Sequence, residues 1–186
     1  YRFVRNQRVK PSAIARSGCA VTAARAADIE KLVCIQDTTA LSYTHRVEGA
    51  GDLGGPKKAT GLGLLVHSAL LVDAGTERTV GLVGQDYWAR DPAERGKKYS
   101  RRTRAYEEKE SFKWQRLSER LQSELDPELS ARVVTVCDRE ADVYAYLAFK
   151  IANGERFVVR ASWDRNVECE AESEQGKALG EHLFAA

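Results

Sequence analysis

The sequence contains no methionine, only three histidines and no closely spaced cysteines. Because the initiator residue is missing, we expect the chain to be processed or to be cut from something longer. The four cysteines show no Cys-x-x-Cys spacing, so a disulfide framework is not expected in a chain of 186 residues, and a reducing cytoplasm fits better. The histidines are isolated from one another and form no zinc-binding pattern: His45, His67 and His182.

Long apolar runs are also missing. None approaches the ~20 residues that a helix needs to cross a bilayer, and no signal peptide opens the chain. With 43% hydrophobic and 30% charged residues, the composition indicates a globular protein, and the length allows one domain with a real core. We therefore expect a cytoplasmic protein without a membrane partner. The net charge of +2 hides strong local segregation, so binding partners have to be inferred from patches.

The first thirty residues have a helical and basic pattern. Ser12 is a candidate N-cap for a helix over residues 13–27, in which Ile14 and the alanines form an apolar face. Ahead of this helix, cationic side chains recur about one helical turn apart: Arg2, Arg5, Arg8 and Lys10. The pattern predicts that residues 1–30 form an N-terminal basic helical segment.

Residues 31–88 have the composition of β-strands. A short buried strand is predicted over residues 31–37, followed by a glycine-rich loop. Two longer β-rich runs, at 62–73 and 78–88, are joined by a short glycine-containing segment of the length that is typical of a hairpin. We expect these three strands to form an antiparallel meander.

Helices and strands alternate in the second half of the chain. A helix is predicted over 111–125, capped by the serine at its start and ended by Pro127. It is followed by a strand over 132–138, a helix over 141–152 and a strand over 156–162. Such β-α-β crossovers are right-handed and make the strands parallel. The order therefore predicts an α/β fold of the ribonuclease H-like type, with a mixed sheet and helices on its faces.

Acidic residues follow two of these strands. Asp37 ends the first strand and Asp138 ends the strand after the first crossover, and on this topology the two strands are neighbours, ~4.8 Å apart. Two adjacent carboxylates repel each other unless a cation lies between them. Oxygen ligands without nearby histidine or cysteine favour Mg²⁺ or Mn²⁺. The pair therefore indicates a metal site suited to phosphoryl transfer.

Each acid also has a purely structural interpretation. Asp138 could cap the helix that follows it, and Glu140 and Asp142 could lie in the first turn of that helix, where negative charge is favourable. Asp37 precedes two threonines and could begin a turn. Strand order alone does not decide between these interpretations and a metal site.

Several long motifs, in the same order and over nearly the whole chain, resemble the bacterial insertion-sequence-4-type DDE transposases. They are IQDTTALSY, GLLVHSALLVDAGTERTVGLVGQDYWAR, EKESFKW, VCDREADVYAYL and ERFVVRA. The resemblance implies a ribonuclease H-like core over residues 31–166, present in part, and the start of a truncated insertion over 167–186. It also implies a bacterial, cytoplasmic and nucleoid-associated protein.

The resemblance assigns roles to individual residues. The first catalytic aspartate of the family carries over to Asp37 and the second to Asp138, which would bind Mg²⁺ or Mn²⁺. Arg160 corresponds to a phosphate contact near the active site, and Arg2 and Arg5 to arginines that approach the transposon end. The partners implied are double-stranded DNA, both transposon ends and target DNA, and a second copy of the protein in the synaptic complex.

The third acid of the family does not carry over. It is a glutamate in the pattern Tyr-x2-Arg-x3-Glu-x6-Lys; Tyr99 and Arg102 match the beginning of the pattern, but position 106 is tyrosine. The family's DNA-recognition region before the core and its dimerisation region after it are also missing. We therefore expect this chain alone to bind divalent metal weakly and to show little or no strand cleavage.

Two other functions are compatible with the sequence. One is a nuclease of the same architecture, such as a junction resolvase or ribonuclease H, which would cut without joining. The other is a non-catalytic DNA-binding remnant of a decayed transposase, which the missing glutamate and the missing methionine would suit.

Overall fold

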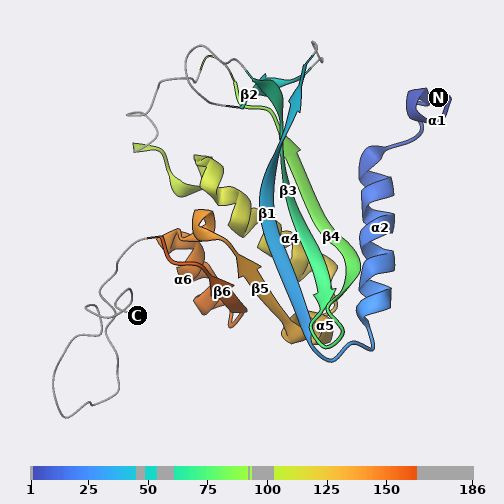
Figure 1. The fold of residues 1–186 in the computed structure, drawn as a ribbon, viewed down its shortest axis with the longest axis vertical. Coiled ribbons are helices and arrows are strands. Elements are labelled where there is room, and N and C mark those ends of the chain that lie inside the picture. Colours follow the sequence, from blue (N-terminus) through green and yellow to red (C-terminus); the bar gives the residue numbers. More distant parts are fainter. Residues whose placement is uncertain (1, 45–48, 54–60, 92, 94–102, 163–186) are drawn as a thin grey trace.

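A computed structural model of the chain describes residues 2–44, 49–53, 61–91, 93 and 103–162. Within these residues the chain forms one six-stranded sheet with helices packed against it (Figure 1). The strands are β1 (Leu32–Tyr43), β2 (Gly51–Asp52), β3 (Leu62–Asp73), β4 (Arg78–Trp88), β5 (Val133–Cys137) and β6 (Arg156–Val159). The predicted insertion over 167–186 lies outside the described residues.

The strand order is that of a ribonuclease H-like fold. The sheet runs β2-β3-β1-β5-β6, and β4 also pairs with β3. The pairs β1–β3 and β3–β4 are antiparallel, whereas β1–β5 and β5–β6 are parallel. The predicted meander, the predicted parallel crossovers and the predicted fold class are thereby confirmed. The division into segments at residues 30 and 166 stays a prediction.

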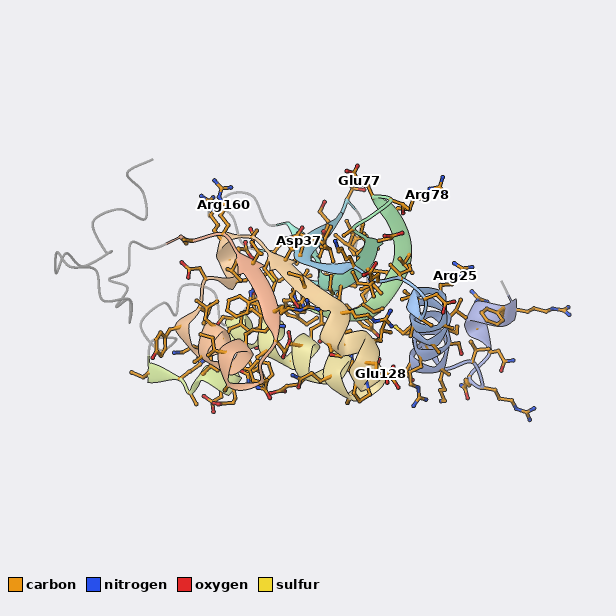
Figure 2. The ribbon with its side chains drawn as sticks, turned by 90° about the horizontal axis from the view of Figure 1, so that it is seen from below. Arg25, Asp37, Glu77, Arg78, Glu128 and Arg160 are labelled. Atoms are coloured by element: carbon orange, nitrogen blue, oxygen red, sulfur yellow. The ribbon has the colours of Figure 1, made fainter. Side chains whose placement is uncertain are left out.

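The helices lie against one side and one edge of this sheet. They are α1 (Arg2–Arg5), α2 (Pro11–Ala26), α4 (Lys113–Glu124), α5 (Pro127–Arg132) and α6 (Tyr144–Ala152), with short 3-10 helices η2 (Tyr106–Glu108), η3 (Glu110–Phe112) and η4 (Arg139–Ala141). Viewed along the sheet, α4, α5 and α6 lie below it, and α2 lies beyond the β4 edge (Figure 2). Among the described residues no helix is long and apolar enough to span a bilayer.

The core lies between the sheet and the helices α4, α5 and α6. Alternate residues of β3 are buried along almost its whole length, which is the pattern of a strand with one covered face. The larger core cluster comprises Ala26, Leu32, Cys34, Ala69, Leu71, Val83, Leu117, Leu121, Leu125 and Leu129. A second cluster lies nearer the end of β5 and comprises Trp114, Cys137, Ala141 and Tyr146.

Two predicted helix N-caps are wrong. Lys10, not Ser12, is the N-cap residue of α2, because Pro11 occupies the first helical turn, where its missing N–H costs nothing. Phe112 precedes α4, and the preceding serine lies in η3. α4 ends at Glu124, just before Pro127, as predicted. Pro127 also begins α5, and the carboxylate of Asp126 accepts a hydrogen bond of 2.8 Å from Glu128 N as the cap.

Candidate active site

Asp37 lies inside a strand, not at its end as predicted. β1 continues to Tyr43 because it pairs with β3 over its full length, and Asp37 is opposite Ser68 in that register. On the other side, the parallel pairing with β5 stops at the pair Gln36–Cys137. Asp37 is therefore the first residue of β1 that has lost its β5 neighbour.

Asp138 follows directly after the last residue of β5. Since Gln36 is paired with Cys137, Asp37 and Asp138 are the next positions on two neighbouring strands, which lie ~4.8 Å apart. Gln36 and Cys137 are buried on the helix-covered face, whereas both aspartates are exposed. Side chains alternate along a strand, so the two carboxylates belong to the opposite, uncovered face.

The charges of both aspartates reach the same buried thiol. Burial raises the pKa of Cys137 to about 11, and the negative charges of Asp138 and Asp37 contribute smaller effects in the same direction. The two carboxylates and this thiol lie on opposite faces of the sheet. The carboxylate oxygens are the ligands that Mg²⁺ and Mn²⁺ prefer. Within the described part of the chain, however, no group of three or more His, Cys, Asp or Glu side chains could hold a metal ion.

Asp138 is a cap, as predicted, but of the 3-10 helix η4 and not of the helix α6, whose N-cap residue is Val143. Asp138 Oδ1 accepts a hydrogen bond of 2.9 Å from Glu140 N and caps η4. A carboxylate has two oxygens with several lone pairs, so a cap on one oxygen is compatible with a cation on the other. The cap also fixes the direction of the carboxylate at the strand end.

The other two acids of the motif have structural contacts. Asp142 is buried, and its Oδ2 accepts a hydrogen bond of 2.7 Å from Ser162 N, which holds the chain that follows β6. It lies between η4 and α6, not in a first helical turn as predicted. Glu140 lies in η4 and forms an ion pair of 3.3 Å with Lys113, whose side chain is nearly buried.

Arg160 is the predicted DNA contact that lies nearest to the two aspartates. It follows β6 directly, its backbone N donates a hydrogen bond of 3.2 Å to Cys137 O, and its side chain is exposed. Figure 2 shows Arg160 and Asp37 on the same side of the sheet, away from the helices. Arg2 and Arg5 lie on α1, which is beyond the opposite edge of the sheet, past the helix α2 that packs beside β4 (Figure 1).

A pair of polar side chains, Thr38 half-buried and His67 fully buried, lies next to Asp37 on the helix-covered face. Thr38 Oγ1 and His67 Nδ1 are 2.9 Å apart, and the His67 ring meets Trp114 edge-on with centroids 4.4 Å apart. Burial lowers the pKa of His67 to about 4, assisted by the positive charge of Lys113. Sequence reasoning assigned no role to either His67 or Lys113, because their neighbours belong to strands and helices far away along the chain.

Comparison with known proteins adds one structural similarity. No protein-family model matches the chain. Among solved structures, a chain of the Mos1 transposase paired-end complex with left transposon end is similar at 13% sequence identity and a TM-score of 0.38. The match covers 83% of the present chain but 44% of that chain. At this level the similarity carries no conclusion about function.

Proposed function

We propose that this chain is part of the catalytic core of a metal-dependent DNA transposase of the insertion-sequence-4 type. The observation that carries the proposal is the parallel pairing of β1 with β5, which ends at Gln36 and Cys137 and makes Asp37 and Asp138 neighbours. The sequence motifs around these two residues support the same function. The partners proposed are transposon-end and target DNA, and a second copy of the protein, in a bacterial cytoplasm.

The proposed chemistry is an in-line attack on a phosphodiester. Asp37 and Asp138 would hold a divalent cation, Mg²⁺ or Mn²⁺, which activates the attacking oxygen and stabilises the leaving one. Arg160, exposed beside them, would contact the scissile phosphate and orient it toward the two carboxylates. Arg2 and Arg5 would contribute sequence-independent affinity for the DNA backbone.

Substitution of one aspartate tests the proposal. In a version of the protein that contains the missing glutamate helix, we expect Asp138→Asn to abolish nicking of transposon-end DNA in Mg²⁺ or Mn²⁺, because the amide removes one negative ligand. Binding of the end DNA should stay nearly unchanged in a gel-shift assay. A variant that still cuts at the normal rate would show that Asp138 is not a metal ligand.

The two alternatives give different results with the same reagents. A nuclease of this architecture would nick DNA but give no joined product in a strand-transfer assay. A non-catalytic remnant is favoured by the presence of only two suitably placed acids among the described residues. It would bind DNA and show no cleavage, even when the reading frame is extended to include the Tyr-Arg-Glu-Lys helix.

A further inference from the structure

The strand that carries Asp37 loses one of its two neighbours at this residue. Up to Gln36, β1 is held by β5 on one side and β3 on the other. From Asp37 onward the register with β5 has ended, and β3 is the neighbour that remains. Twisting of β1 at this point would move the Asp37 carboxylate relative to Asp138.

One side-chain hydrogen bond, partly buried, links β1 to β3 at the next residue. Thr38 and His67 are directly opposite in the antiparallel register, and their side chains hydrogen-bond at 2.9 Å on the covered face of the sheet. His67 is completely buried, and its ring is held edge-on by Trp114 of α4. The contact therefore links β1 to a fixed point in the core.

Stability alone does not account for a histidine at this position. Its Nε2 is buried and has no hydrogen-bond partner among the described residues, as is also true of Trp114 Nε1. A buried polar atom without a partner costs free energy, and an apolar residue would fill the same space without that cost. Departures of this kind from the rules of core packing are typical of functional sites.

We propose that Thr38 and His67 are positioning residues that fix the Asp37 carboxylate for cation binding. The inference rests on the proposed function, in which Asp37 is a metal ligand. Thr38 and Asp37 point to opposite faces of the same strand, so the Thr38–His67 bond acts through the backbone of β1. It holds the strand against β3 where the support of β5 has ended.

Binding of Mn²⁺ to the purified chain tests the proposal, with free Mn²⁺ followed by electron paramagnetic resonance. We expect Thr38→Val to weaken binding about tenfold, at the lower end of the range for groups that support a metal ligand. Thr38→Ser keeps the hydroxyl and should restore the wild-type affinity. The matched control is Thr135→Val on β5, three positions before Asp138. It removes the hydroxyl of a buried threonine, which accepts a hydrogen bond of 3.1 Å from Lys150 Nζ.

Each result has a definite meaning. Weaker binding by Thr38→Val, with Thr38→Ser and Thr135→Val like the wild type, supports positioning. Equal losses of Mn²⁺ affinity in Thr38→Val and Thr135→Val would reflect general destabilisation and would overturn the proposal. Wild-type affinity of Thr38→Val would overturn it as well. Asp37→Asn separates this failure from failure of the proposed function. If Asp37→Asn binds Mn²⁺ like the wild type, or if the wild type binds none, Asp37 is not a ligand and both proposals fall.

Discussion

Two thiols, those of Cys34 and Cys137, lie on the helix-covered face of the sheet, on the neighbouring strands β1 and β5. Both are free and buried. Burial raises the pKa of Cys34 to about 12 and that of Cys137 to about 11, from an ordinary value of 9.0. A thiol with a raised pKa stays protonated and unreactive at neutral pH. These residues therefore behave as small apolar core residues.

The buried thiols make stability fall at alkaline pH. Above about pH 9 the Cys34 thiol loses its proton in the unfolded chain and keeps it in the folded chain. The free energy of unfolding therefore falls as the pH rises, until the pH reaches the pKa of about 12 in the folded chain. Each such group contributes about 1.4 kcal/mol per pH unit to the slope. We expect Cys34→Val to remove that part of the slope in urea unfolding measured at several alkaline pH values.

Cys19 supplies the control for this measurement. It is half-buried on α2, and its pKa is raised by burial, with the charge of Glu124 acting in the same direction. Because part of its surface is already in water, Cys19→Val should leave most of the alkaline slope in place. A Cys34→Val variant with the full wild-type slope would show that the Cys34 thiol ionises as easily in the folded chain as in the unfolded one.

At the scale of elements, glycine allows α2 to pack closely against β4. Gly81 has φ +155°, and a Cβ added there would lie 2.4 Å from Thr22 Oγ1 on the helix. Thr22 and Ala26 are the buried residues of α2, whereas residues 11–18 of the same helix are exposed. The docking of this helix therefore depends on a narrow contact near its C-terminal end.

Gly81→Ala should weaken that contact. We expect the free energy of unfolding to fall by about 2–3 kcal/mol, because the added methyl overlaps the helix and alanine disfavours a positive φ. Adding Thr22→Ala should recover part of the loss in thermal or urea unfolding. The control is Gly18→Ala on the exposed part of α2, where an added Cβ meets nothing within 4 Å; it should stabilise by about 1 kcal/mol. Equal stability of Gly81→Ala and the wild type would mean that α2 does not pack here.

The elements that were predictable are those with a strong local pattern. The hairpin of β3 and β4, the strand β5 and the stop of α6 at Asn153 and Gly154 follow from alternation, β-branched residues and a glycine with φ +63°. The predicted end of β1 at residue 37 is wrong. Aspartate followed by threonine is typical of a turn, whereas pairing with β3 extends the strand to Tyr43. Tertiary pairing of this kind overrides local preference.

At the scale of the whole molecule, the two aspartates become neighbours only through strand order. The order of helices and strands was enough to predict that β1 and β5 are adjacent. It did not predict the polar residues behind the site. Lys113 is nearly buried, with its ammonium 5.8 Å from the Trp88 ring centroid, and His67 is bonded to Thr38. Such contacts depend on side-chain packing between distant segments, which periodicity does not encode.

The distribution of charge in the whole molecule is uneven although the net charge is only +2. Residues 1–27 contain no acidic residue, and their cations are Arg2, Arg5, Arg8, Lys10, Arg16 and Arg25. The segment forms α1 and α2, beyond the β4 edge of the sheet (Figure 1). Arg160 is exposed beside the aspartates, well away from this segment. A DNA duplex bound by both regions would therefore have to extend across the molecule.

The dependence of DNA binding on salt tests whether both regions contact phosphates. Each neutralised phosphate contributes about 0.9 to the slope of log K against log salt for duplex DNA. We expect the double variant Arg2→Ala, Arg5→Ala to reduce the magnitude of the slope by about 2 and Arg160→Ala by about 1, in fluorescence anisotropy with labelled duplex. Arg78→Ala is the control. Arg78 is exposed at the start of β4 and lies in register with Leu32, at the other end of the strands from Asp37. Equal slopes for the wild type and the Arg160 variant would remove Arg160 from the DNA interface. A reduced slope for the Arg78 variant would extend the interface to the other end of the strands.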